Sequence, residues 1–110
     1  SHPDHEICKE NVEFLRTQTD ARGRSLQVVE VQAPTKVTDE DGGWTDYSYI
    51  NHYLCNGGVV LCGFDDPRDE IAAGTFRRLF PDRTVTLVDA RTIFAGGGGI
   101  HCITQQQPKV

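Results

Sequence analysis

The sequence contains no methionine, even at position 1, so we expect a processed or excised chain. Basic residues are in the minority, because 11 lysines and arginines stand against 16 acidic residues, for a net charge of −5 and a pI of about 5.2. This balance argues against a nucleic acid or an anionic membrane as a partner. No apolar run reaches the length of a membrane span and no signal peptide opens the chain, so we expect a cytoplasmic protein.

Cysteine pairs at close spacing are also missing. The four cysteines, Cys8, Cys55, Cys62 and Cys102, form no C-x-x-C motif. Without a secretory signal, reduced thiols are a better expectation than two disulfides. A zinc site from His52, Cys55, Cys62 and a fourth ligand is an alternative, but the spacing matches no common zinc finger.

At 110 residues, with 25% charged and 37% hydrophobic residues, the chain fits a single globular domain over 1–110 with a modest core. The hydrophobic periods predict an α/β fold in which helices pack on a mixed sheet. In chain order we first expect a helix over 4–21 ended by Gly23, a strand over 26–31 and a polar loop over 33–44. Two β-rich runs follow, over 47–54 and 59–64, around an Asn56–Gly57 turn. We then expect a helix to about Leu79, a strand over 84–88, a helical turn over 89–95 and a final strand over 100–105.

Acidic residues gather at two places. Asp39, Glu40 and Asp41 lie in the predicted loop, where they could attract a cationic substrate, although a solvated loop explains them more simply. At the start of the second helix, Asp66 is placed to cap and Pro67 to occupy the first helical position. Capping therefore explains this second group better than catalysis does.

Four consecutive glycines, 96–99, precede Cys102 near the end of the chain. Each glycine loses more backbone entropy on folding than any other residue, so such a run usually serves positive φ angles or a close approach to the main chain. A thiol just beyond it is a candidate nucleophile. The alternative is a glycine hinge that leads into a last strand, with Cys102 as a small buried apolar residue.

Five motifs occur in the order and at the spacing of a known family. They are Ser48–Tyr53 (SYINHY), Asn56–Val60 (NGGVV), Phe80–Arg83 (FPDR), Val88–Arg91 (VDAR) and Gly96–Pro108 (GGGGIHCITQQQP). In these motifs the chain resembles the C-terminal portion of agmatine deiminases, a bacterial peptidyl-arginine deiminase-like family of the guanidino-modifying pentein superfamily. Members of that family are much longer than this chain.

The resemblance implies a pentein fold, an α/β propeller of five ββαβ modules around a central active site. Residues 1–32 would then end the preceding module, and residues 45–105 would form the last module, which carries the catalytic cysteine. The chain would hold the propeller incompletely. Because an isolated module leaves an apolar side uncovered, we expect a homo-oligomer, absent N-terminal modules or marginal stability.

The resemblance also implies a reaction, the hydrolysis of agmatine to N-carbamoylputrescine and ammonia through a covalent amidino intermediate on Cys102. The substrate would be a small cationic guanidino compound on the route to putrescine and the polyamines. Gly97, Gly98 and Gly99 would let it approach the backbone. No metal or organic cofactor is implied.

Two residues depart from the family pattern. Gly99 stands where members commonly have asparagine, which puts a side-chain contact in doubt but leaves the nucleophile in place. His52 stands where members more often have an aromatic residue, so we interpret it as filling that place. His101 would point to the opposite face of a strand from Cys102, and we interpret it as structural.

The general-acid histidine and the guanidinium-binding carboxylates of the family belong to earlier modules, and their motifs are missing here. Asp39, Glu40, Asp41 and Asp89 are poor substitutes, since the first three fit a loop and the last a helix cap. We therefore expect negligible turnover from this chain alone. The alternatives are a peptidyl-arginine deiminase, a non-catalytic domain that binds a partner or guanidino ligand, and an α/β domain without guanidine chemistry.

Overall fold

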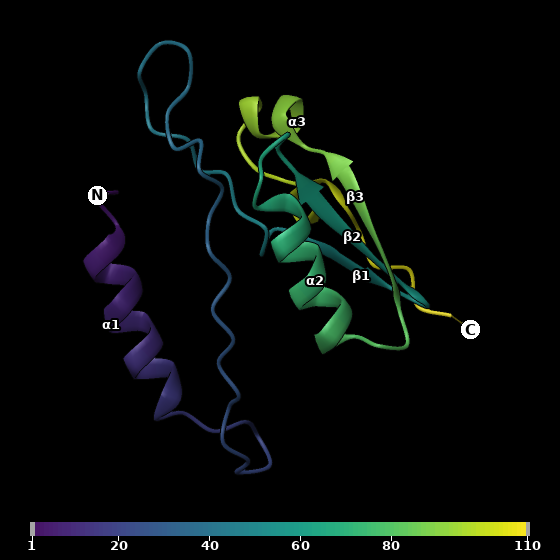
Figure 1. The fold of residues 1–110 in the computed structure, drawn as a ribbon. Coiled ribbons are helices and arrows are strands. Elements are labelled where there is room, and N and C mark those ends of the chain that lie inside the picture. Colours follow the sequence, from purple (N-terminus) through teal and green to yellow (C-terminus); the bar gives the residue numbers. More distant parts are fainter. Residues whose placement is uncertain (1, 110) are drawn as a thin grey trace. The chain divides into compact units, whose positions relative to one another are not determined.

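A computed structural model describes residues 2–109, and the chain divides into two compact units between Glu30 and Val31 (Figure 1). The first unit holds one helix, and the second holds a small sheet with its helices. The expected assignment of residues 1–32 and 45–105 to successive modules of a propeller stays a prediction.

In the first unit, helix α1 spans His5–Arg16 and ends before the expected limit at residue 21. The carboxylate of Asp20 explains the earlier end, because it accepts hydrogen bonds from the backbone N–H groups of Arg22 and Arg24 and so stabilises a turn. Gly23, with φ of 74°, belongs to that turn and does not stop the helix directly. No residue of α1 is buried, and residues 2–30 hold no other helix or strand that could cover its apolar side chains.

The strand expected over 26–31 is wrong. Residues 26–31 belong to no strand, and the nearest bridge is an isolated one between Thr19 and Ser25. A β-prone sequence forms a strand only where a partner strand accepts its hydrogen bonds, and none lies beside it within residues 2–109.

The second unit is built on a ββαβ arrangement, and its fold class agrees with the sequence prediction (Figure 1). Its elements are β1 (Tyr53–Cys55), β2 (Gly58–Gly63), α2 (Asp69–Leu79), β3 (Thr84–Asp89) and α3 (Arg91–Ala95). β1 and β2 form the predicted Asn56–Gly57 hairpin, with Cys55 opposite Gly58. α2 then crosses over so that β3 pairs parallel to β2. β2 takes the central position in the sheet, which its mostly apolar sequence favours.

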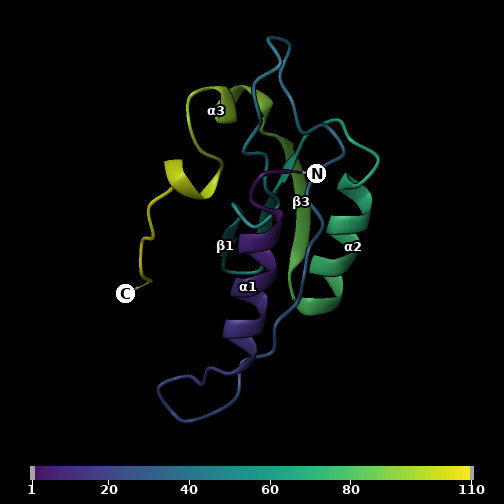
Figure 2. The same ribbon diagram turned by 90° about the vertical axis from the view of Figure 1, so that its left-hand side faces the viewer.

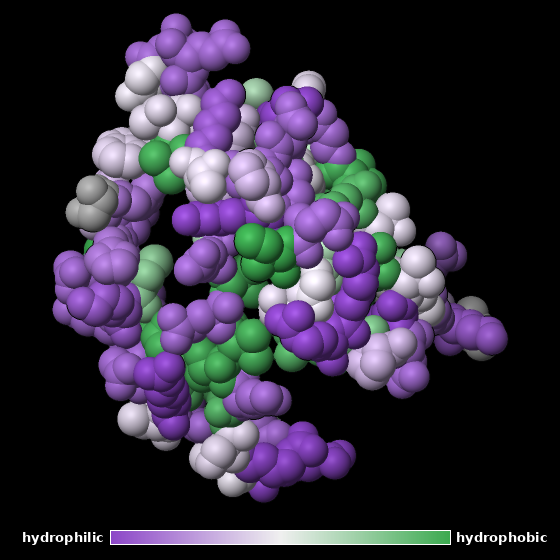
Figure 3. Space-filling model, in the orientation of Figure 1, coloured by the Kyte–Doolittle hydropathy of each residue, from purple (hydrophilic) through white to green (hydrophobic). Residues whose placement is uncertain are grey.

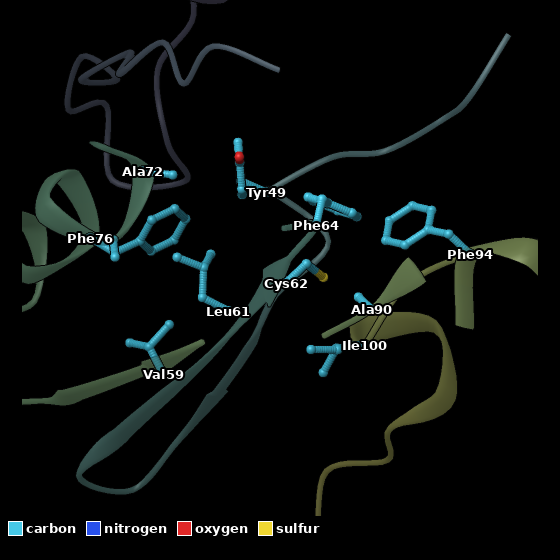
Figure 4. Close-up of a cluster of buried hydrophobic side chains, with 11 residues drawn as sticks. Tyr49, Val59, Leu61, Cys62, Phe64, Ala72, Phe76, Ala90, Phe94 and Ile100 are labelled. Carbon is cyan, nitrogen blue, oxygen red and sulfur yellow. The ribbon is translucent and has the colours of Figure 1, made fainter. Parts of the chain in front are cut away.

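The core lies between α2 and the sheet and continues past β2 to Ala90, Phe94 and Ile100 (Figures 2 and 4). α2 packs on β2 and β3 through Ala72, Ala73 and Phe76. The remaining buried apolar residues are Tyr49, Val59, Leu61, Cys62, Phe64, Ala90, Phe94 and Ile100. Burial of these side chains is the main source of stability for so small a unit.

The strand expected over 100–105 is also wrong, because His101–Ile103 form a single 3-10 turn. The backbone N–H of Cys102 donates to the carbonyl of Gly99 at 3.1 Å, as a 3-10 turn requires. The N–H of His101 donates to the side chain of Asn51 rather than to a strand. By contrast α3 confirms the predicted helical turn. Ala90 and not Asp89 is its N-cap, and the carboxylate of Asp89 accepts the N–H of Arg91 just ahead of the turn.

Several apolar side chains stay on the surface, where the green atoms of Figure 3 mark apolar residues. In the second unit Ile50, Ile71 and Ile103 are each about two-thirds exposed. Ile71 lies on α2, whose buried residues are Ala72, Ala73 and Phe76. No helix within residues 2–109 has both the length and the apolar character that crossing a bilayer would demand.

Candidate active site

The thiol of Cys102 is exposed in the 3-10 turn that follows the glycines. A buried apolar residue, the alternative considered from the sequence, would not lie in this position. Local hydrogen bonds hold the shape of the turn. Both the backbone N–H and the side-chain hydroxyl of Thr104 donate to the carbonyl of His101. The sulfur is therefore accessible to a small molecule while its backbone is fixed.

Asn51 orients this thiol from a distant part of the sequence. Its Nδ2 donates to the Sγ of Cys102 at 3.1 Å, and its Oδ1 accepts the N–H of His101 at 2.9 Å. The second bond fixes the amide orientation, because only the nitrogen end can then face the sulfur. The backbone carbonyl of Asn51 also accepts the Cys62 thiol at 2.9 Å. One residue thus contacts two of the four thiols.

The segment that carries Asn51 is held by the core. The Tyr49 hydroxyl donates to the carboxylate of Asp69 at 2.7 Å, and that carboxylate also accepts the N–H groups of Phe64 and Asp66. Burial and the neighbouring Asp69 raise the pKa of Tyr49 above its ordinary range, so the hydroxyl stays a donor. This network links α2 and the end of β2 to the position of Asn51.

The thiols of Cys102 and Cys62 differ in acidity. The hydrogen bond from Asn51, followed by that from the backbone at Gly99, lowers the pKa of Cys102, while the charge of Asp46 opposes this effect. Burial raises the pKa of Cys62. Because the thiolate is the nucleophilic form, Cys102 is the better nucleophile of the two.

The glycines make room for neighbouring side chains of the chain itself. A Cβ on Gly99 would lie 2.6 Å from the ring of Phe94 and 2.7 Å from the side chain of Asn51. Gly98 has φ of 129°, and its Cβ would lie 3.0 Å from the Cys102 sulfur. Around Gly97 there is open space within 4 Å. The contact of these glycines with a substrate stays a prediction.

A shallow hollow of about 300 Å³ adjoins the thiol-bearing turn. Its lining residues are Ser48, Ile50, Asn51 and His101. Two of them, Asn51 and His101, also neighbour Cys102, whose own side chain does not line the hollow.

His101 and His52, the two histidines in the family motifs, lie in different surroundings. His101 is exposed in the turn, so the argument that a strand points it away from Cys102 does not apply. His52 packs edge-on against Phe76 with ring centroids 4.5 Å apart, as an aromatic residue would. Burial lowers its pKa, which keeps the ring neutral.

The carboxylates judged poor substitutes have partners of their own. Asp89 pairs with Arg91 at 2.6 Å, and this contact lowers its pKa to about 2. Asp39 accepts the N–H groups of Asp41 and Gly43 inside the 33–44 loop. These contacts support structural roles for Asp89 beside α3 and for Asp39 in the loop.

The zinc set considered from the sequence is not assembled. Across residues 2–109, no three His, Cys, Asp or Glu side chains are grouped as metal ligands. His52 instead contacts Phe76, and the Cys62 thiol donates to a backbone carbonyl.

Sequence reasoning missed Asn51. Asn51 lies inside the Ser48–Tyr53 motif, which was a usable signal, but nothing in the sequence ties it to a thiol 51 residues away.

Comparison with known proteins agrees with the motifs. The sequence model of the Porphyromonas-type peptidyl-arginine deiminase family matches residues 1–108. The chain belongs to this family. A curated protein of Streptomyces avermitilis, named "Putative agmatine deiminase", is 77% identical over 109 residues, which are 99% of this chain and 31% of that protein. The chain thus spans about a third of the length of such relatives.

Solved structures of similar proteins have the same fold over the region that this chain covers. An X-ray structure named as a "putative agmatine deiminase" has 35% identity and a TM-score of 0.90, over 99% of this chain and 34% of that one. The agmatine deiminase of Enterococcus faecalis has 30% identity and a TM-score of 0.87, over 97% of this chain and 34% of that one. The predicted resemblance and the predicted fold class, part of a pentein-type α/β fold, are both confirmed.

Proposed function

We propose that this chain supplies the nucleophile of an agmatine deiminase, with Cys102 as the attacking residue. The observation that carries the proposal is the exposed Cys102 thiol, held by the Asn51 amide at 3.1 Å and with a pKa lowered by that contact. The names of the 77% identical relative and of the Enterococcus faecalis structure support agmatine as the substrate.

The reaction places clear demands on the thiol. A guanidinium is a poor electrophile, so the Cys102 thiolate must attack its central carbon directly. A C–S bond forms, a terminal C–N bond breaks, and the NH2 group takes up one proton and leaves as ammonia. Water then adds to the amidino-cysteine carbon and the C–S bond breaks. N-carbamoylputrescine and the free thiol are the products.

Asn51 serves the first step in this scheme. Its Nδ2–H faces the sulfur and stabilises negative charge there before the attack. The proton for ammonia and the carboxylates around the guanidinium come, by the family resemblance, from the part of the enzyme that this chain lacks. A role in putrescine synthesis in the cytoplasm belongs to the same proposal.

A graft tests the proposal. Residues 2–109 replace the matching third of the Streptomyces avermitilis relative, whose 77% identity over this region favours correct packing. We expect agmatine hydrolysis by the grafted protein, loss of it in Cys102→Ser, and little change in the matched variant Cys8→Ser, which alters an exposed thiol on α1. Turnover that survives in Cys102→Ser contradicts the proposal. The 110-residue chain alone should give negligible turnover.

A peptidyl-arginine deiminase is the second candidate, and the description of the matching family favours it. The same thiol would then attack the guanidinium of an arginine within a peptide. Parallel assays of the grafted protein with agmatine and with an arginine-containing peptide separate the two. A third outcome, no turnover of either together with slow alkylation of Cys102, indicates a non-catalytic domain.

A further inference from the structure

Cys62 is a buried thiol on the central strand β2, and the proposed reaction makes no use of it. Successive side chains of a strand point to opposite faces of the sheet, so Cys62 points away from the face that carries Leu61 (Figure 4). On its own face the Cys62 thiol reaches the main chain of Asn51. Its S–H donates to the carbonyl of Asn51, with 2.9 Å between sulfur and oxygen.

Burial makes this thiol a lasting donor. It raises the pKa of Cys62, so the sulfur keeps its proton at neutral pH and can donate it to an acceptor. The backbone N–H of His101 approaches the same Asn51 carbonyl at 3.4 Å, a longer contact. Cys62 therefore provides the shorter of the two bonds that this carbonyl accepts.

Asn51 carries the effect of this bond to the nucleophile. Its main chain is held at both ends, since its N–H donates to the carbonyl of Ser48 at 3.3 Å and its carbonyl accepts the Cys62 thiol. Its side-chain Oδ1 accepts the N–H of His101 at 2.9 Å. Only Nδ2 then remains for the sulfur of Cys102, at 3.1 Å. Two thiols, one buried and one exposed, are thus joined by hydrogen bonds to a single residue.

We propose that Cys62 is a positioning residue, whose thiol fixes the main chain of Asn51 and, through it, the amide that donates to Cys102. This inference rests on the proposed function and extends it to a residue outside the five motifs. Cys62 does not contact the reacting atoms. Its loss should therefore weaken the stabilisation of the Cys102 thiolate and lower kcat more than it raises KM.

Two substitutions separate the hydrogen bond of Cys62 from its packing. Cys62→Ser keeps a donor at this position, whereas Cys62→Val keeps an apolar side chain of similar size without a donor. If Cys62 acted by packing alone, valine would replace it better than serine. As a positioning residue it gives the reverse order. Cys55→Val makes the same change on β1, where the thiol has no hydrogen bond within residues 2–109.

Timed alkylation of the grafted protein by iodoacetamide, with peptide mapping, reads the state of Cys102 without turnover. At neutral pH we expect Cys62→Val to slow alkylation of Cys102 about two- to fivefold, less than loss of the direct donor would. The pH profile should shift to higher pH, because a less stabilised thiolate forms at higher pH. Cys62→Ser and Cys55→Val should keep the original rate and profile. None of these changes alters the charge of Asp46, the carboxylate whose charge reaches Cys102.

Cys62→Ala guards against a fold disturbed by valine, since it removes the donor and adds no volume. It should give the same shift as Cys62→Val. An unchanged pH profile in Cys62→Val and Cys62→Ala overturns the inference. So does slower alkylation in Cys62→Ser than in Cys62→Val, because packing would then be the cause.

Agmatine turnover separates failure of the inference from failure of the proposed function. In an active graft, Cys62→Val should lower kcat about two- to fivefold, in step with alkylation, and change KM less. If the unsubstituted graft hydrolyses no agmatine, the proposed function fails, and the alkylation profiles alone decide whether Cys62 positions Asn51. If the graft is active and Cys62→Val leaves kcat and the profile unchanged, the inference fails and the proposed function stands.

Discussion

The side-chain amide of Asn51 donates a hydrogen bond to the sulfur of Cys102 at 3.1 Å, across 51 positions of the sequence. The same amide accepts the backbone N–H of His101, so its orientation is fixed from two directions. This pair joins the segment before β1 to the turn at the end of the chain. As its main consequence, the thiolate of Cys102 has a hydrogen-bond donor, the Asn51 amide.

Replacing Asn51 by alanine should raise the pKa of Cys102, since the largest favourable contact of the thiolate is lost. At neutral pH we expect alkylation of Cys102 to slow about three- to tenfold, the range for a hydrogen bond to a charged group that is partly exposed. Peptide mapping after timed iodoacetamide exposure measures this. Asn11→Ala on α1 is the matched control and should change nothing. Equal alkylation in both variants contradicts the assigned role of Asn51.

Gly99→Asn introduces the residue that the family commonly has at this position. Its Cβ would lie 2.6 Å from Phe94 and 2.7 Å from Asn51, so one of them must move. We expect a loss of about 1–3 kcal/mol in the free energy of unfolding, as in other overpacked sites. Urea denaturation of the second unit measures it. Gly74→Asn on α2 is the control, because its Cβ would meet only the guanidinium of Arg78, at 3.7 Å, and its φ is not positive. If both variants are equally stable, Phe94 and Asn51 do not confine Gly99.

Tyr49→Phe removes one hydroxyl and leaves the aromatic ring in the core. The carboxylate of Asp69 then loses its 2.7 Å donor but keeps the backbone donors at Phe64 and Asp66. The expected cost is about 1–2 kcal/mol of unfolding free energy. A thermal melt compares it with Tyr53→Phe, whose hydroxyl has no hydrogen bond within residues 2–109. Equal melting temperatures would show that the Tyr49–Asp69 contact adds no stability.

His52→Phe should make the protein less sensitive to mild acid. Burial lowers the pKa of His52 below its ordinary 6.5, so the unfolded chain binds the proton more readily than the folded one. Stability contributed by the neutral ring is present at higher pH and is lost as pH falls through about 6.5 toward the lower folded value. Urea midpoints between about pH 7.5 and 5 should fall less steeply in His52→Phe. His5→Phe, on the exposed surface of α1, should keep the original slope.

Local patterns predicted much of the second unit. The Asn56–Gly57 turn between two β-prone runs predicted the hairpin that β1 and β2 form. The apolar run of β2 is typical of the central strand that it is. Acidic residues and Pro67 ahead of an amphipathic stretch gave α2. In each case the residues that decide the structure are close together in the sequence.

The two wrong strands fail for one physical reason. Residues 26–31 and 100–105 have suitable side chains, but a strand also needs a neighbouring strand with free backbone groups. Around residue 101 the Asn51 side chain takes the N–H that a strand would use. Such a competitor comes from a distant segment, which is also why the pairing of Asn51 with Cys102 could not be predicted.

Trapping of the covalent intermediate tests the central claim most directly. The grafted protein is mixed with agmatine, quenched with acid within milliseconds to seconds, and its peptides are mapped by mass. We predict an amidino adduct on the peptide that contains Cys102, absent in Cys102→Ser. An adduct on another cysteine, or agmatine turnover by Cys102→Ser, would contradict the assignment of Cys102 as the nucleophile.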